Sequence, residues 1–167
     1  MAISDSFLPE LDHEAAGTRK TLARIPQDKF DWKPHEKSYS FQELASHISN
    51  LPVWATMVAG ESGLDIAPVG EDPPRQEAVT SVEHALQVFD QNVGAARDAI
   101  AGLDDEAMME TWTLLAGGEE IFSMPRAAVI RSFIMNHLIH HRAQLSLYLR
   151  LNDVAMPALY GPTADEE

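Results

Sequence analysis

The 167-residue sequence contains no cysteine, and this absence excludes several kinds of site at once. A chain without thiols forms neither a disulfide scaffold nor a cysteine-ligated zinc site, and it has no cysteine nucleophile. A metal site in this protein would therefore need ligands other than thiolate.

Positive charge is also scarce. The chain has 12 Lys and Arg against 26 Asp and Glu, which gives a formal net charge of -14. Because surplus negative charge repels phosphate groups, this balance argues against binding to nucleic acid and to anionic membrane surfaces.

The sequence has no basic amino-terminal segment followed by an apolar run, and no apolar stretch long enough to span a membrane. Since neither a signal peptide nor a transmembrane segment is indicated, we expect a cytoplasmic protein. Hydrophobic residues make up 45% of the chain, a share typical of a globular protein and not of a disordered one. We expect one folded domain over residues 1–167.

Four stretches repeat apolar residues in steps of three and four, which predicts helices and not strands. They cover approximately residues 8–25, 41–60, 82–103 and 124–151. The narrow apolar stripes favour a bundle in which each helix buries one face.

Helix-capping patterns stand before three of these stretches. Ser40 with Glu43 and Thr80 with Glu83 have the spacing of a capping box, and Ser123 is the expected N-cap of the last helix. At the other end of the last helix, Asn152 is the residue expected to close it in a left-handed conformation. Within the second stretch, Pro52 predicts a kink or a local break.

The connections refine the fold. Residues 60–79 are rich in proline and glycine and lack helical periodicity, and this connection is long enough to join two parallel helices. Residues 104–122 contain two short apolar runs around Gly117 and Gly118, which indicate a small β-hairpin. The predicted fold is therefore an all-α four-helix bundle with a possible hairpin before the last helix.

Histidines cluster in the last predicted helix, within the segment NHLIHHRAQLSLYLR, and no Asp or Glu occurs from residue 121 to 152. At 100° per residue, His141 lies about 40° to one side of His137 and His140 about 60° to the other. All three lie on the stripe expected to be buried. His137 and His141 are one turn apart, so both can reach a single metal ion.

A third ligand would come from another helix, and His47 on the second predicted helix is the best candidate. His13, His35 and His84 are weaker candidates, because they lie among acidic residues or in a proline-flanked loop. Three neutral imidazoles without a fourth protein ligand would resemble a catalytic zinc site more than a structural one. The alternative is that these histidines are hydrogen-bonded core residues, and spacing alone leaves both interpretations open.

Neighbouring residues have two interpretations each. Glu43 is a helix cap or a general base, and Gln144 is a hydrogen-bond partner of a ligand imidazole or a self-satisfied core residue. Tyr148 fills the core or lines a pocket. Arg142 points roughly 140° away from His137, which favours a structural ion pair or a dimer contact.

The segments KSYSFQELASHISNLPVW, NHLIHHRAQLSLYLR and MPALYGPTADE together resemble the DinB-like (DinB/YfiT) superfamily over nearly the whole chain. The resemblance implies an up-down-down-up helical bundle, often a homodimer, with a metal triad at His47, His137 and His141. Ala143 and Asn152 depart from residues common in that family, and neither belongs to the triad.

The resemblance also implies functions. The superfamily includes enzymes that transfer or isomerise low-molecular-weight thiols, and many proteins described as metal-dependent hydrolases. We therefore expect a divalent metal, with zinc or nickel first and iron or manganese next, and a small-molecule substrate. A non-catalytic, metal-stabilised binding or stress-response module is the alternative. No catalytic residue beyond the metal site is identified.

Overall fold

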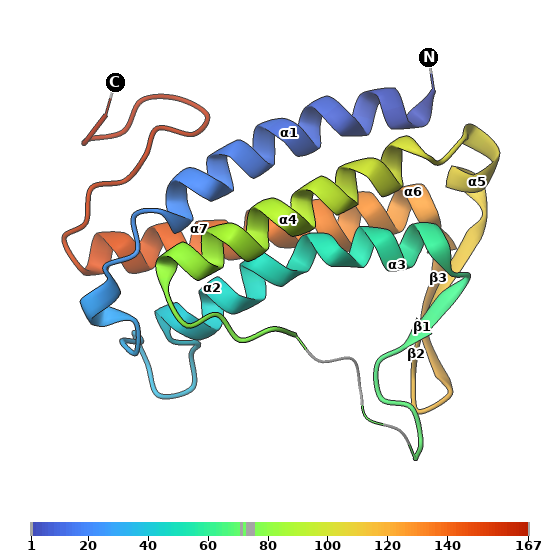
Figure 1. The fold of residues 1–167 in the computed structure, drawn as a ribbon, viewed down its shortest axis with the longest axis horizontal. Coiled ribbons are helices and arrows are strands. Elements are labelled where there is room, and N and C mark those ends of the chain that lie inside the picture. Colours follow the sequence, from blue (N-terminus) through green and yellow to red (C-terminus); the bar gives the residue numbers. More distant parts are fainter. Residues whose placement is uncertain (1, 71, 73–75, 167) are drawn as a thin grey trace.

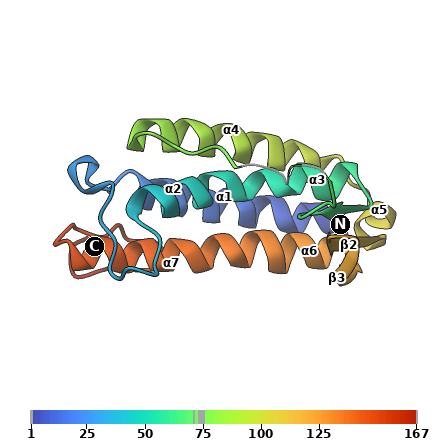
Figure 2. The ribbon, with the colours of Figure 1, turned by 90° about the horizontal axis from the view of Figure 1, so that it is seen from below.

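The computed structural model describes residues 2–70, 72 and 76–166, and helices dominate it (Figures 1 and 2). The helices are α1 (Ile3–Leu22), α2 (Phe41–Asn50), α3 (Trp54–Gly60), α4 (Val82–Ala101), α5 (Asp105–Met109), α6 (Arg126–Val129) and α7 (Asn136–Leu151). The long helices lie side by side: α1 contacts α4 and α7, and α2 also contacts both. In this part of the chain, no helix is long and apolar enough to cross a membrane.

A small sheet is added at one end of the helices (Figure 1). Its strands are β1 (Gly63–Asp65), β2 (Thr111–Ala116) and β3 (Glu119–Pro125), in the order β1-β2-β3. The hairpin prediction is confirmed, because β2 and β3 pair antiparallel around Gly117 and Gly118, which both have positive φ. The all-α class is confirmed only in part, since β1, from the long connection, also pairs with β2 in parallel.

Two predicted helix starts are wrong, and one is confirmed. Ser40 and Glu43 form the capping box of α2. The cap of α4 is Ser81, whose side chain accepts a hydrogen bond from the amide of His84, and not Thr80. Ser123 is not a cap, because it lies in β3 and pairs with Thr113, so the helical segment starts only at α6.

The break at Pro52 is confirmed. α2 ends at Asn50, a 3₁₀ turn covers Leu51–Val53, and α3 follows. Proline has no amide hydrogen to continue the α-helical ladder, and its ring collides with the preceding turn. Only Asp153 of the described non-glycine residues has a positive φ, so the left-handed residue follows Asn152 and is not Asn152 itself.

A π-helical segment, Ile130–Met135, joins α6 to α7 into one rod (Figure 2). The sequence pattern predicted an uninterrupted helix there. π-helical turns within α-helices are frequently found at functional sites. Here the next turn begins with Asn136 and His137.

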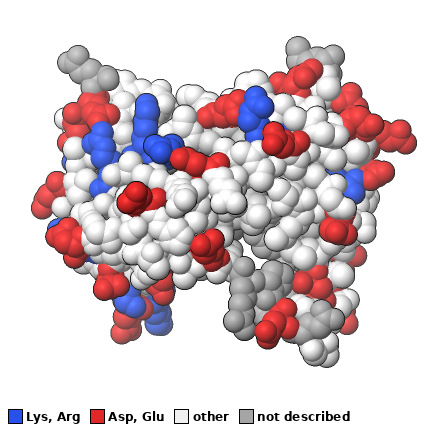
Figure 3. Space-filling model, viewed as in Figure 1, with Lys and Arg blue, Asp and Glu red and all other residues white. Residues whose placement is uncertain are grey.

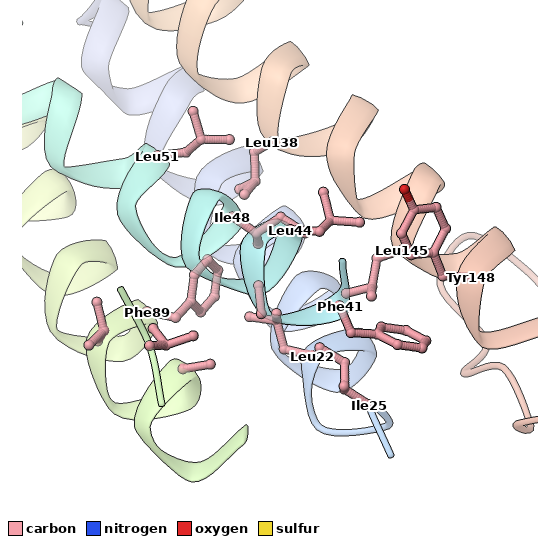
Figure 4. Close-up of a cluster of buried hydrophobic side chains, with 14 of the residues drawn as sticks. Leu22, Ile25, Phe41, Leu44, Ile48, Leu51, Phe89, Leu138, Leu145 and Tyr148 are labelled. Atoms are coloured by element: carbon pink, nitrogen blue, oxygen red, sulfur yellow. The ribbon is translucent and has the colours of Figure 1, made fainter. Parts of the chain in front are cut away.

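The main core fills the space between the helices (Figure 4). Figure 4 labels Leu22, Ile25, Phe41, Leu44, Ile48, Leu51, Phe89, Leu138, Leu145 and Tyr148, which come from α1, α2, α4, α7 and adjoining turns. A second cluster around Trp112 and Ile134 lies near the sheet. The first cluster holds α2 against α7, and this contact places His47 opposite two histidines of α7.

Candidate metal centre

Three histidines from two helices meet at one point. His47 lies in the last turn of α2, and His137 and His141 lie one turn apart on α7. One ring nitrogen of each lies within 4.8 Å of a ring nitrogen of the other two. The Nε2 atoms of His47 and His137 are 3.4 Å apart, and the ring centres of His47 and His141 are 4.4 Å apart.

Each ring has an oxygen acceptor near its other nitrogen. Nδ1 of His141 lies 2.8 Å from Oε1 of Gln144, and Nδ1 of His47 lies 3.4 Å from Oε1 of Gln76. His137 hydrogen-bonds the backbone of Phe133, one turn earlier. These oxygens only accept, so they favour the tautomer with the proton on the outer nitrogen.

This arrangement fits a metal ion. With their protons on the outer nitrogens, the three rings direct lone pairs at one another, and lone pairs at such distances repel unless a cation lies between them. Among the described residues, no carboxylate and no fourth histidine joins the group. A donor set of three neutral imidazoles suits zinc, nickel or iron and leaves room for a further ligand.

Burial favours the neutral form of each imidazole. Desolvation is the largest cause that lowers the pKa of His47, His137 and His141 below 6.5, and the pKa of His141 falls to about 4. The positive charge that the neighbouring imidazoles would carry lowers the pKa of His137 and His141 further. The three side chains are therefore neutral near pH 7, as metal ligation requires.

Two hollows adjoin the triad, and Tyr39 lines both of them. One of about 350 Å³ is lined by Tyr39, Gln42, Glu43, Ser46, His47, Gln76, Glu77 and Ala78. The other, of about 280 Å³, is lined by Lys37, Ser38, Tyr39, His141, Gln144 and Tyr148. A small molecule in either hollow would lie against a histidine of the triad.

The other predicted residues lie beside the site with clear structural partners. One carboxylate oxygen of Glu43 accepts a hydrogen bond from the amide of Ser40, as the capping box requires. Tyr148 is buried edge-on against Trp32 and Phe41. Burial is the main cause that raises the pKa of its phenol.

Arg142 is excluded from the triad, as its position on the helix predicted. Its guanidinium forms a buried ion pair of 2.7 Å with Glu14 on α1, and both also contact the hydroxyl of Tyr160. His84 pairs with Glu77, and His13 lies against Tyr160.

Sequence reasoning missed Gln76, Lys37 and the carbonyl of Phe133. Gln76 and Lys37 lie outside the regular helices, so no periodic pattern points to them. Phe133 accepts the hydrogen bond of His137 with its backbone, so the identity of its side chain gives no sequence signal for this role.

A model of the DinB family matches residues 3–167. Because the match covers nearly the whole chain, this protein belongs to the DinB family, in agreement with the resemblance seen in the sequence. A relative, the "Uncharacterized protein YrdA" of Bacillus subtilis (strain 168), is 22% identical over 164 residues, which are 97% of this chain and 90% of the relative.

Two solved structures share the fold. A DinB-like protein from Bacillus cereus ATCC 10987 superposes with a TM-score of 0.69 at 20% identity, over 93% of this chain and 97% of the other. The DinB-like protein YjoA from Bacillus subtilis gives a TM-score of 0.68 at 18% identity, over 97% and 99% of the two chains. At these identities, the likeness shows the fold and not a shared activity.

Proposed function

We propose that this protein is a metal-dependent enzyme in which His47, His137 and His141 bind one divalent ion, zinc or nickel in the first place and iron or manganese in the second. The observation that carries the proposal is the convergence of three neutral imidazoles beside two hollows, one lined by His47 and the other by His141. A metal that only stabilised the fold would need no hollow beside it.

The metal, when bound, would supply Lewis-acid chemistry by lowering the pKa of a coordinated water or thiol to near neutrality. A thiol S-transferase and a hydrolase are the two reaction classes that this chemistry and the family resemblance support. The chain's own residues would orient the ligand imidazoles through Gln76, Gln144 and Phe133, and would position the substrate in the adjacent hollows.

Lys37 is the residue proposed to bind an anionic end of the substrate. It is the cation among the residues that line the two hollows, and none of its side-chain contacts in the described chain is an ion pair. In a protein of net charge -14, a lysine beside the triad would offset part of the repulsion that an anionic substrate meets. A low-molecular-weight thiol with a carboxylate is one such substrate.

Metal content is the first test. Untagged wild-type protein should contain about one metal ion per chain, and His47→Ala and His137→Ala should each lose it, because two imidazoles bind a divalent ion much more weakly than three. Elemental mass spectrometry measures this. His13→Ala is the matched control, since His13 lies away from the triad, and it should retain the metal.

Absence of metal after reconstitution at neutral pH would contradict the proposal and leave the histidines as core residues. If metal binds, the loaded protein should be assayed with thiols plus electrophiles, and separately with esters, amides and lactones. Activity that survives in His137→Ala would exclude the triad from the reaction. Metal binding with a large rise in thermal stability, but no turnover of either substrate class, would favour the non-catalytic binding module.

Three further features are part of this proposal. The four-helix, up-down-down-up arrangement is supported by the helix directions in Figure 1, where α2 and α3 run the same way as α4. A homodimer and a cytoplasmic location follow from the family resemblance and from the sequence. Light scattering tests the homodimer, because the mass of a monomer would contradict it.

A further inference from the structure

His140 stands between the two α7 histidines of the triad in sequence, but it is not a member of the group. It is exposed, so the prediction that it lies on the buried stripe is wrong. It nevertheless contacts a residue that holds the triad. Its Nε2 lies 3.0 Å from the amide nitrogen of Gln144, and the amide oxygen of Gln144 lies 2.8 Å from Nδ1 of His141. We propose that His140 is a positioning residue that acts on the metal site through Gln144. This inference rests on the proposed metal site.

The direction of the Gln144 amide decides which nitrogen of His141 carries the proton. With the amide oxygen toward His141, Nδ1 must donate, so Nε2 is free of a proton and is the nitrogen left to bind a metal ion. With the amide reversed, its N–H group would face Nδ1, and the proton of His141 would move to Nε2. A protonated Nε2 offers no lone pair to a metal ion, so only the first direction permits ligation.

His140 can hold that direction, because its Nε2, when it carries no proton, accepts a hydrogen bond from the amide N–H of Gln144. The two residues are one turn apart on α7, so helix geometry alone keeps them in reach. In the described chain, the side-chain amide nitrogen of Gln144 has no other hydrogen-bond partner than this ring. Removing the ring would leave the amide nitrogen of Gln144 to mobile water, so the contact that holds the Gln144 side chain on this side would be lost.

A double-mutant cycle on metal affinity tests the proposal. Metal binding is measured by competition with a chelator for wild type, His140→Ala, Gln144→Leu and the double variant. Gln144→Leu should weaken binding roughly 10- to 100-fold, as expected for the loss of a hydrogen-bond partner of a ligand. His140→Ala should weaken it roughly three- to tenfold, and should have no further effect in the Gln144→Leu background, because its action passes through Gln144.

Asn136→Ala, on the exposed face of α7 one turn before His140, is the control and should leave the affinity unchanged. Unchanged affinity in His140→Ala would overturn the proposal. The proposal would also be overturned if His140→Ala weakened metal binding equally in wild type and in the Gln144→Leu background. His140 would then act on the metal independently of Gln144.

A second measurement does not depend on metal. In the metal-free protein at about pH 8, where imidazoles are neutral, nitrogen NMR of His141 should show the proton on Nδ1. In His140→Ala the signal should shift toward a mixture of the two tautomers. Identical tautomer signals in both proteins would overturn the role of His140 even if the triad binds metal. If wild type fails to bind metal but the tautomer signal still shifts in His140→Ala, the proposed function is overturned and the positioning of His141 through Gln144 remains.

Discussion

At the scale of single residues, neighbours in sequence have unrelated tasks. His141 faces the triad, while Arg142 points to the other side of α7 and is buried to 3% exposure against Glu14, itself 7% exposed. Gly17 leaves room for this guanidinium: a Cβ there would lie 3.0 Å from its nitrogen. Tyr160 from the carboxy-terminal segment closes the cluster. The ion pair thus connects α1, α7 and the carboxy-terminal segment directly behind the metal centre.

Glu14→Ala should destabilise the protein by about 3–5 kcal/mol, because it leaves the Arg142 charge buried without its partner. Urea unfolding followed by circular dichroism measures the change. Asp12→Ala is the control on the same helix, since Asp12 pairs with Arg97 at the surface and should contribute less than about 1 kcal/mol. Equal losses in the two variants would contradict a special role for the buried pair.

At the scale of secondary-structure elements, one carboxylate links two parts of the small sheet. Asp65 at the end of β1 accepts hydrogen bonds from the amides of Ala67, Gly117 and Gly118, at 2.9, 2.9 and 2.7 Å. These bonds lower its pKa, the bond from Ala67 most of all. The carboxylate therefore joins β1 to the turn of the β2–β3 hairpin.

Asp65→Ala should loosen β1 and the hairpin turn while leaving the helices intact. We expect faster hydrogen exchange at the amides of Ile66, Gly117 and Gly118, since these groups lose their acceptor or the strand pairing beside it. Exchange in α7 should stay unchanged. Glu119→Ala, a substitution at an exposed strand residue, serves as the control, and similar acceleration in that variant would contradict the role of Asp65.

At the scale of the whole molecule, acidic residues spread over the face drawn in Figure 3, with basic residues between them. In this mostly acidic protein, the three histidines of the triad have pKa values that lie below the usual value of an imidazole. The pKa of His141 falls to about 4, so between about pH 4 and 6.5 the unfolded chain binds more protons at this residue than the folded protein does. The lowered pKa values of His47 and His137 act in the same direction. By linkage, their contribution to stability is fully present above pH 6.5 and is lost as pH falls toward 4.

Metal-free wild type should therefore gain stability relative to His141→Gln between about pH 5 and about pH 7.5. The comparison cancels the titration of the many carboxylates, which both proteins share. Urea unfolding with a chelator present measures both free energies. A difference that is constant across this pH range would mean that the folded site does not disfavour the charged imidazole.

Much of the fold was predictable because it rests on local patterns. The helical stripes, the Ser40–Glu43 cap and the break at Pro52 all depend on residues within one or two turns of each other. The errors occur where distant contacts compete with local signals. The local pattern at Ser123 predicts a helix cap, but Ser123 pairs with a residue of β2 and lies in a strand. The π-helical turn before His137 has no characteristic side-chain spacing that would predict it.

The donor chemistry was readable from the sequence: without cysteine, and with His137 and His141 one turn apart, α-helical geometry places two imidazoles on one side of α7. His47, 90 residues earlier, was the best candidate for the third ligand, but its approach to His137 became visible only in the folded structure. The folded structure also added Gln76, from an irregular connection, as the acceptor for the outer nitrogen of His47. The physical reason is that helix periodicity is a local property of the chain, whereas the partners across α2 and α7 are set by how their apolar faces pack into one core.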